Sequence, residues 1–301
     1  MNGILIIDKH AGMTSHDVVN AVRRILREHS VGHLGTLDPL ATGVLPLVVG
    51  NFTRLAQFYS HCEKSYEGVI CFGFATDTYD AEGEPAGSKQ TPNLSLQQAK
   101  QMAVRFTGTI MQTPPPFSAK KIAGVPAYKL ARKRKKVALT AVPVEIQEFE
   151  ILECDGERAS FRARVASGTY MRSVAHDMGQ VLGCGAHLES LRRTAVAEFA
   201  IGDALTLEQL SSAAEEQRIE DVFVHPRKIL PELPSITASD EMVARIRTGR
   251  TVNLPELSRA AKIKVFAGQR ELVAIATRVA GTLFHAKLVL APETAAQLVR
   301  H

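Results

Sequence analysis

The sequence predicts a mixed α/β protein of the α+β class, in which a large domain at residues 1–230 precedes a small β domain at 235–301. Strand-like and helix-like patterns alternate along the large domain without a repeated strand–helix–strand unit, which favours a central, largely antiparallel sheet. Two prolines interrupt any regular element at 230–234, so this segment is the best linker candidate. A chain of 301 residues is long enough for both domains.

The first half of the large domain predicts two strands and two helices. A short apolar run at 4–7 is typical of a buried strand, and 66–74 alternates as a half-buried strand does. Residues 14–26 begin with a Thr–Asp capping-box pair, and 95–106 begin with a serine cap. The expected apolar faces of these two helices comprise Val18, Val22, Ile25, Leu26, Leu96, Ala99, Met102 and Phe106.

The second half of the large domain predicts two further strands and a helix. The strands are expected at 144–153 and 159–165, and the second alternates regularly between apolar and polar residues. A helical stripe from 171 to 182 ends at Gly183, a residue type that often ends helices. The stripe comprises Met171, Val174, Ala175, Met178, Val181 and Leu182.

The small domain predicts one helix followed by short strands. The helix is expected at about 240–248, and two strands at 263–266 and 271–277 form a hairpin around a Gly-Gln turn. A last strand is expected at 283–290. This pattern indicates a compact β domain.

The composition excludes several classes of protein. A hydrophobic content of 45% fits a soluble globular chain, and no apolar run approaches the ~20 residues of a membrane span. The N-terminus lacks the pattern of a signal peptide, and the four cysteines are scattered without a Cys-x-x-Cys pair. We therefore expect a cytoplasmic protein without disulfides, without a metal site and without a cofactor.

The net charge of +5 is unevenly distributed. Residues 235–301 contain ten Lys and Arg against five Asp and Glu. A second basic segment contains eight cations and no acid, and we expect these side chains to contact the backbone of a nucleic acid: Lys120, Lys121, Lys129, Arg132, Lys133, Arg134, Lys135 and Lys136. Two separated basic regions favour an extended nucleic acid over a small acidic metabolite as the partner.

The segment 32–46 places a single carboxylate, Asp38, in an uncharged run of Gly, Pro, Thr and aliphatic residues. An isolated Asp-Pro pair usually marks a turn. Here the aliphatic neighbours Leu37, Leu40, Val44 and Leu45 are expected to exclude water from the carboxylate. Glycines at 35 and 43 permit a positive φ or the close approach of another chain. The segment is therefore typical of a reactive carboxylate held at the rim of a pocket.

This segment resembles the catalytic motif of the bacterial tRNA pseudouridine-55 synthase (TruB) family, and other motifs follow in that family's order. The resemblance covers about residues 3–210. Its motifs lie at 3–9, 12–19, 32–46, 64–67, 76–80, 115–120, 168–177 and 191–194.

The resemblance implies the reaction and its three principal residues. Members of the family isomerise uridine to pseudouridine in the T-loop of tRNA, at position 55. Asp38 matches the nucleophile, Tyr66 the ring on which a flipped-out uridine stacks, and Arg172 the cation paired with the nucleophile. Burial would raise the pKa of Asp38, and the arginine would oppose that rise.

The resemblance also implies the wider substrate site. His33, Tyr170, Leu191, Asp80 and Lys64 match positions around the flipped nucleotide. The basic segment lies in an insertion at about 118–142 that closes over the tRNA T arm. The C-terminal region resembles the small RNA-binding β-barrel called PUA and is expected to contact the acceptor stem.

The sequence departs from the family pattern at two places near the RNA. Arg132-Lys133-Arg134 carries more positive charge than the family's usual Arg-x-Gly, and Phe117 stands where tyrosine is common. Both departures bear on RNA grip and local packing, and neither touches the expected nucleophile. His16 and His176 are expected to be structural.

Three alternatives stay open at the level of the sequence. The first is a synthase of this kind that acts on a different RNA or under the direction of a guide RNA. The second is a tRNA-binding folding factor. A basic β-domain protein without chemistry fits the ordered motifs poorly. We expect a monomer, although the sequence does not determine the oligomeric state. It also does not distinguish attack at C1′, attack at C6 and elimination.

Overall fold

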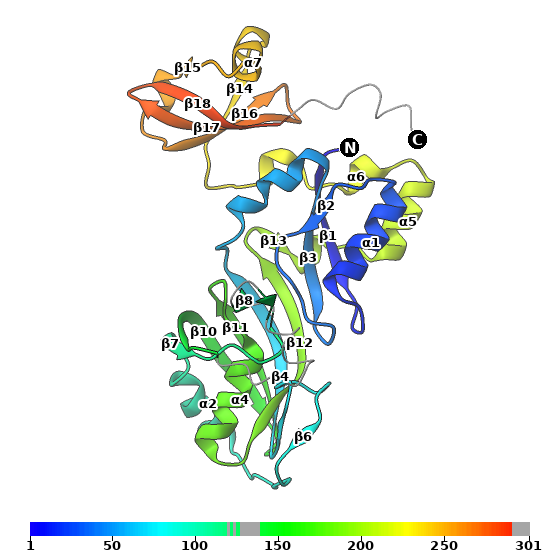
Figure 1. The fold of residues 1–301 in the computed structure, drawn as a ribbon, viewed down its shortest axis with the longest axis vertical. Helices are drawn as coiled ribbons and strands as arrows, with labels where there is room; N and C mark the ends of the chain where they lie inside the picture. Colours follow the sequence, from blue (N-terminus) through cyan, green and yellow to red (C-terminus); the bar gives the residue numbers. More distant parts are fainter. Residues whose placement is uncertain (119–120, 123–124, 127–138, 291–301) are drawn as a thin grey trace.

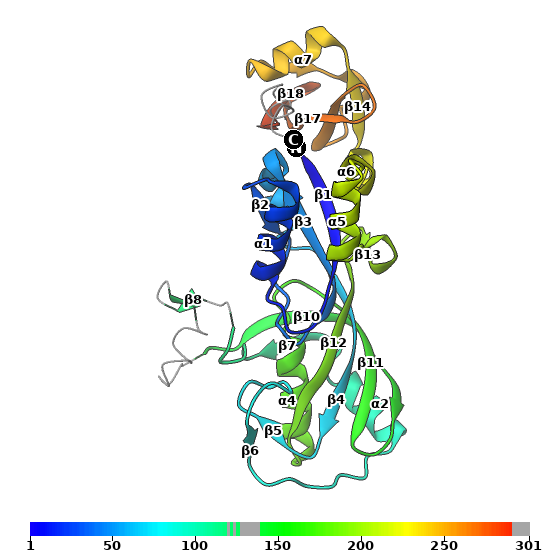
Figure 2. The same cartoon turned by 90° about the vertical axis from the view of Figure 1, so that its right-hand side faces the viewer.

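The computed structural model describes residues 1–118, 121–122, 125–126 and 139–290. Within these residues, nine strands form one mixed sheet whose main path runs β1-β3-β12-β4-β11-β10-β7. Figures 1 and 2 show that this sheet extends through most of the elongated molecule, with a small C-terminal domain at one end. The strands are β1 (Gly3–Lys9), β2 (Val31–His33), β3 (Thr42–Val49), β4 (Lys64–Phe72), β7 (Gly108–Gln112), β10 (Val142–Cys154), β11 (Arg158–Val165), β12 (Ala186–Val196) and β13 (Phe199–Ala200).

The expected mixed α/β class with a largely antiparallel sheet is confirmed. In the described part of the chain, the strand pairings of this sheet are antiparallel except that of β12 with β3. Two shorter pairs accompany it: β5 (Ala75–Thr76) with β6 (Pro85–Ala86), and β8 (Lys121–Ile122) with β9 (Val125–Pro126).

Helices lie against both ends of the sheet. The helices α1 (Ser15–Leu26), α5 (Leu207–Glu215) and α6 (Ile219–Val222) lie beside β1 and β3, whereas α2 (Leu96–Val104) and α4 (Met171–Leu182) lie beside β4 and β10–β12 (Figure 1). One continuous apolar cluster contains residues from α1, α2, α4, α5 and the sheet. The two ends of the large domain therefore share a core.

The caps of these helices are as predicted. Thr14 and Asp17 form a capping box at the start of α1, and Ser95 with Gln98 forms another at α2. Gly183 ends α4 in the left-handed region, with φ of 75°. These contacts are local in sequence, which explains why the pattern alone identifies them.

The strand β1 is buried on both faces. Leu5 and Ile7 belong to the main core, whereas Ile4 and Ile6 belong to a second apolar cluster on the other side of the sheet. A strand covered on both faces has no polar side. This is why residues 4–7 read as an uninterrupted apolar run.

The central strand β12 is the main element that the sequence pattern does not reveal. It pairs with both β3 and β4, yet it contains Glu189, Arg192 and Arg193. Its register against β4 shifts after Leu188 and again after Arg193, so the alternation of a regular strand is lost.

Three details of the predicted elements are wrong. The strand expected at 66–74 ends at Phe72, because Gly73 turns the chain with φ of 113°. Leu96 and Val181, which the pattern places on buried helix faces, are 37% and 46% exposed. The stripe of α4 is otherwise buried from Met171 to Met178.

The C-terminal part at 235–290 contains a curled sheet of five strands in the order β14-β16-β17-β18-β15. The expected helix and hairpin are confirmed. The elements are β14 (Ser235–Ala238), α7 (Asp240–Arg247), β15 (Val252–Asn253), β16 (Lys262–Ala267), β17 (Glu271–Ala280) and β18 (Leu283–Val289).

The two parts of the chain are packed together. Phe266 and Leu272 of the small domain share the second apolar cluster with Phe52 and Leu55 of the 3₁₀ helix η1 (Gly50–Phe58). The buried Lys264 donates hydrogen bonds from Nζ to the carbonyls of Ile229, at 2.7 Å, and Arg227. The segment at 230–234 is therefore not a free spacer, since Leu230 is itself buried.

None of the helices in the described ranges is long and apolar enough to cross a membrane.

Candidate active site

A cleft of about 990 Å³ lies where the segment 33–41, strand β4, the turn at 78–82 and the start of α4 meet. Segments from all parts of the large domain meet in it, and they carry every substrate-site residue expected from the sequence. The side chains in question are His33, Asp38, Lys64, Tyr66, Asp80, Tyr170, Arg172 and Leu191.

Asp38 stands on a loop that the neighbouring backbone holds in place. The buried Ser15, at the start of α1, accepts from the Leu37 N–H at 2.8 Å and donates to the Leu37 carbonyl at 3.0 Å. Lys9, at the end of β1, donates from Nζ to the carbonyls of Pro39 and Met13. The residues on both sides of Asp38 are thereby attached to the first two elements of the fold.

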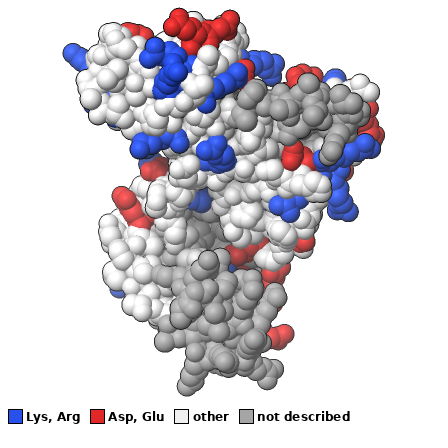
Figure 3. Space-filling model, turned by 45° about the horizontal axis from the view of Figure 1, so that its top comes forward, with Lys and Arg blue, Asp and Glu red and all other residues white. Residues whose placement is uncertain are grey.

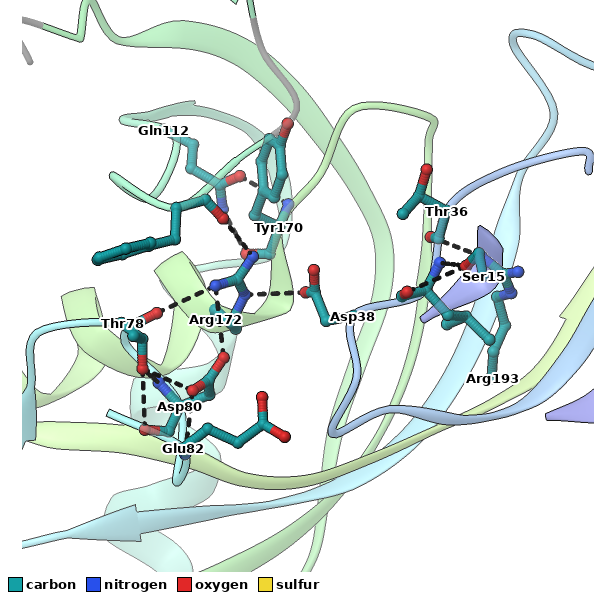
Figure 4. Close-up of polar contacts among 12 residues, drawn as sticks. Ser15, Thr36, Asp38, Thr78, Asp80, Glu82, Gln112, Tyr170, Arg172 and Arg193 are labelled. Carbon is teal, nitrogen blue, oxygen red and sulfur yellow. Dashed lines mark hydrogen bonds and ion pairs between the residues drawn. The ribbon is translucent and has the colours of Figure 1, made fainter. Parts of the chain in front are cut away.

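Arg172 joins this loop to the other half of the site. Its side chain is only 6% exposed, and its Nε lies 2.9 Å from Oδ2 of Asp38, in an ion pair. Its Nη1 lies 3.3 Å from Oδ2 of Asp80, and the guanidinium also donates to the carbonyls of Thr78 and Phe117. Figure 4 shows the guanidinium between the two carboxylates.

The environment of Asp38 shifts its titration as expected from the sequence. Burial by the surrounding protein raises the pKa of Asp38, while the adjacent Arg172 opposes the rise. Its side chain is still 39% exposed, towards the open cleft. A carboxylate in this position is fixed by a cation on one side and accessible to a substrate on the other.

Asp80 lies behind Arg172, away from the open side of the cleft. Its side chain is 4% exposed, and its Oδ1 accepts hydrogen bonds from the Thr78 hydroxyl and the Glu82 N–H. Asp80 is thus itself held by the turn that carries it (Figure 4). Its contacts fix the orientation of Arg172.

The aromatic and apolar side chains line the remaining walls. Tyr66, on β4, is 7% exposed. Leu191, on β12, lines the same cleft, as does Tyr170 at the start of α4. Burial raises the pKa of the Tyr170 phenol.

The backbone of Tyr170 is fixed by a side chain that the sequence pattern does not identify. Gln112, at the end of β7 and 1% exposed, accepts from the Tyr170 N–H at 2.8 Å and donates to the Tyr170 carbonyl at 3.1 Å. This two-point contact holds the backbone of Tyr170 against the end of β7. No sequence signal marks it, because the two residues meet only in the folded chain.

His33 and Lys64 also line the cleft. Burial lowers the pKa of both side chains. His33 Nδ1 accepts from the Gly35 N–H at 3.3 Å, which fits a neutral ring. Lys64 donates from Nζ to the carbonyl of Cys62 at 2.9 Å.

Several expectations about the site need correction or fall outside the described residues. Val44 and Leu45 do not wall off Asp38; both are fully buried in β3, in the two apolar clusters on either face of the sheet. Phe117 is at the cleft, contacting Arg172 through its carbonyl. His16 lines the cleft, and His176 stacks on Tyr79 with ring centroids 3.7 Å apart.

Of the expected basic RNA contacts, only the backbone of Lys121 is described, and the others lie outside the described residues: Lys120, Lys129, Arg132, Lys133, Arg134, Lys135 and Lys136.

Sequence reasoning assigns no role to several residues of the site: Lys9, Ser15, Thr78, Glu82, Gln112 and Arg193. Lys9, Ser15, Thr78 and Arg193 stand inside the family motifs, so the motifs are the available signal. Among the described residues, no group of three or more His, Cys, Asp and Glu side chains is placed to hold a metal ion.

Family models match most of the large domain. Residues 23–171 match the model described as TruB family pseudouridylate synthase, N-terminal domain. Residues 172–231 match the model described as tRNA pseudouridylate synthase B C-terminal domain. Asp38 lies in the first of these regions and Arg172 at the start of the second, so the site draws on both.

Curated relatives cover nearly the whole chain. The tRNA pseudouridine synthase B of Solibacter usitatus is 48% identical over 293 residues, which are 96% of this chain and 100% of the relative. The protein of the same name from Geobacter sulfurreducens is 38% identical over 270 residues, 90% of this chain and 89% of the relative.

Solved structures share the fold. A chain of the Cbf5–Nop10–Gar1 complex superposes with a TM-score of 0.71 at 26% identity, covering 96% of this chain and 85% of that chain. A chain of the archaeal box H/ACA sRNP Nop10–Cbf5 complex gives 0.70 at 25% identity, with 96% and 86% covered. On these matches, and with an arginine-paired aspartate in the cleft described above, the chain is an isomerase that belongs to the TruB family of pseudouridylate synthases.

Proposed function

We propose that the protein converts uridine 55 in the T-loop of tRNA to pseudouridine, with Asp38 as the nucleophile. The ion pair between Asp38 and the buried Arg172, at the wall of a cleft lined by Tyr66, carries the proposal. The relatives named tRNA pseudouridine synthase B support the choice of substrate.

The reaction needs no net redox change and no hydrolysis. The glycosidic C1′–N1 bond breaks, the uracil turns, and a C1′–C5 bond forms. C5 loses a proton, and N1 gains one. A carboxylate can supply covalent catalysis for such a rearrangement. Asp38 meets the requirement, because it is fixed at its backbone and accessible at its carboxylate.

Arg172 opposes protonation of the nucleophile and holds it in place. An adjacent cation favours the ionised form of a carboxylate that burial would otherwise protonate. Asp80 and the carbonyls of Thr78 and Phe117 hold the guanidinium, so it has little freedom to turn away from Asp38. Asp80 thus acts on the reaction through Arg172.

The target uridine must leave its stacked position in the RNA to reach Asp38. Unstacking costs a few kcal/mol, and stacking on an aromatic ring returns ~1–3 kcal/mol. The chain has no tryptophan, so a tyrosine or phenylalanine must provide this face. Tyr66 lines the same cleft as Asp38, as do Leu191, Tyr170, His33 and Lys64.

The C-terminal domain is proposed to hold the acceptor stem, in the manner of a PUA domain, while the insertion at 118–142 grips the T arm. Figure 3 shows Lys and Arg side chains spread over the small domain and the large domain beside it. Arg250, Arg259 and Arg270 are exposed in the small domain. All groups that the proposed reaction uses come from one chain, so we propose that a cytoplasmic monomer suffices.

Release of tritium from tRNA carrying [5-³H]uridine tests the proposal, because only substitution at C5 frees that label. Wild-type protein should release one label per tRNA. Asp38→Asn should bind tRNA and release none, because asparagine keeps the shape but cannot act as an anionic nucleophile. Asp155→Asn is the matched control, since Asp155 is an exposed turn residue between β10 and β11.

A transcript with cytidine at position 55 tests the position. Loss of all release from this transcript supports uridine 55, whereas undiminished release assigns the activity to another uridine. Turnover by Asp38→Asn, with deamidation excluded by mass spectrometry, would remove Asp38 from the mechanism.

A further inference from the structure

Arg193 is the most completely buried charged side chain of the site. It is 0% exposed, and its three donor nitrogens reach backbone carbonyls. Nε donates to Val44 at 2.7 Å, Nη2 to Gly35 at 3.0 Å and Nη1 to Thr36 at 3.3 Å. Figure 4 shows the guanidinium beneath the loop that carries Asp38.

The three carbonyls belong to the two arms of one loop. Gly35 and Thr36 come just before Asp38, and Val44 belongs to β3, into which the loop returns. A single rigid guanidinium therefore ties the entry of the loop to its exit. Its planar fork of donors suits this geometry in a way that a single ammonium does not.

Arg193 also lies next to Tyr66. The two residues are direct partners in the antiparallel pairing of β12 with β4. Directly opposed residues of an antiparallel pair project to the same face, about 5 Å apart at Cβ. The Tyr66 phenol is accordingly among the groups that raise the pKa of Arg193 against the larger lowering by burial.

Such a residue is costly to the fold. Removing a charged group from water is unfavourable unless hydrogen bonds replace the solvent, and the partners found for Arg193 are neutral carbonyls rather than a carboxylate. An apolar side chain would fill the same space without that cost. What the guanidinium adds is a fixed geometry between the loop of Asp38 and the strand of Tyr66.

We propose that Arg193 is a positioning residue for the isomerisation, which fixes the Asp38 loop relative to Tyr66 through the carbonyls of Gly35, Thr36 and Val44. This inference rests on the proposed role of Asp38 as the nucleophile. Arg193 does not touch the reacting atoms; it acts through the loop. Ser15 holds the same loop from the side of α1, at Leu37.

The test uses two substitutions in the full-length protein. Arg193→Lys keeps the charge but can satisfy fewer of the carbonyls, and Arg193→Met removes the charge and all donors. Arg192→Lys is the matched control, because Arg192 is the preceding residue of β12 but points to Asp8, with a half-exposed side chain. Single-turnover tritium release with enzyme in excess gives the rate, and tRNA titration gives Kd and the folded, binding-competent fraction.

Positioning predicts a loss in rate per binding-competent molecule. A displacement of about 1 Å at a reacting group can cost about 100-fold. We expect about tenfold for Arg193→Lys and about 100-fold for Arg193→Met, with unchanged Kd, and no loss for Arg192→Lys. A purely structural role would reduce the binding-competent fraction and leave the rate of that fraction at the wild-type value, which overturns the proposal.

Hydrogen exchange of the free protein gives a readout that does not depend on activity. Arg193→Lys should accelerate amide exchange in peptides covering 34–44, and Ser15→Ala should do so at Leu37 without threatening the fold. Unchanged exchange in 34–44 overturns the proposal even if the wild type is active. If the wild type releases no label, the proposed function fails, whereas the exchange result still decides whether Arg193 holds the loop.

Discussion

Gly43 lies directly opposite Arg193, where β3 and β12 run parallel for two residues. A Cβ at Gly43 would stand 2.2 Å from the carbonyl oxygen of Arg193, and the glycine has φ of 97°. The sequence suggests that Gly35 and Gly43 serve a positive φ or the close approach of another chain, and at Gly43 both reasons apply. This contact allows the Asp38 loop to lie directly against β12.

Gly43→Ala should destabilise the protein by at least about 2 kcal/mol, because the backbone strain and the steric conflict act together. Urea unfolding measures the loss. Gly87→Ala is the control: Gly87 has φ of 92°, but nothing lies within 4 Å of an added Cβ. It should cost about 1 kcal/mol, from strain alone. Equal losses for the two variants would show that the close approach of β12 is unimportant.

Substitutions at Tyr66 separate stacking from proton transfer. Tyr66→Phe keeps the ring, so stacking alone predicts a nearly normal rate of tritium release, whereas Tyr66→Ala should lose most of it. Equal inactivity of the two variants would assign a chemical task to the hydroxyl. Tyr59→Phe is a matched control, since Tyr59 is buried against Phe199 and contacts Glu198, away from the cleft. Normal turnover by both Tyr66 variants would contradict a place for this ring in the site.

Asp177, on α4, should make the stability of the protein depend on pH. Burial raises its pKa to about 6 from an ordinary value of 3.8. The folded state therefore holds this proton more tightly than the unfolded state does, and stability falls as pH rises from about 4 to 6. Asp177→Asn should stabilise the protein by about 1 kcal/mol at pH 7.5, after allowance for partial exposure, and not at pH 3.5.

The opposite sign at Asp155 provides the control for this measurement. Backbone hydrogen bonds from Arg158 and Glu157 lower the pKa of Asp155. Its contribution is present above the ordinary pKa and is lost as the solution becomes acidic. Asp155→Asn should therefore weaken the protein at neutral pH. Chemical denaturation across the pH range would contradict our interpretation if Asp177→Asn gave the same change at every pH.

The charge of the small domain is best tested in the full-length chain, because the packing of Phe266 and Leu272 against η1 means that truncation would expose apolar surface. Replacement of Arg250, Arg259 and Arg270 by glutamine should weaken tRNA binding and leave turnover at saturating tRNA unchanged. Each phosphate that the protein no longer neutralises should make the negative slope of log K against log salt shallower by about 0.9, the value for duplex DNA.

Exposed cations at the far end of the large domain supply the control for that experiment. Lys89, Lys100 and Arg105 are also exposed, near and on α2. Replacing these three by glutamine changes the net charge equally and should leave the slope unchanged. A similar change of slope in both triple variants would mean that the small domain makes no particular contact with the phosphate backbone.

Local elements of the fold can be predicted because their signals lie within a few residues of one another. The capping boxes at Thr14 and Ser95 and the alternation of β11 are of this kind. The strand β12 escapes prediction because charged residues and two register shifts conceal its alternation. Both flanking strands pair with β12, and this pairing sets its place in the sheet.

The sequence by itself determined the class of fold, the caps of the helices and the segment that holds Asp38. These features depend on composition and on residues that lie within a short distance of one another in the sequence. Only the tertiary structure decided that Arg172 lies 2.9 Å from Asp38, that Gln112 fixes Tyr170 and that Arg193 donates to a carbonyl of the Asp38 loop. These contacts join residues far apart in sequence. They form only once burial of the apolar strand faces has set the order of the sheet, with β12 between β3 and β4.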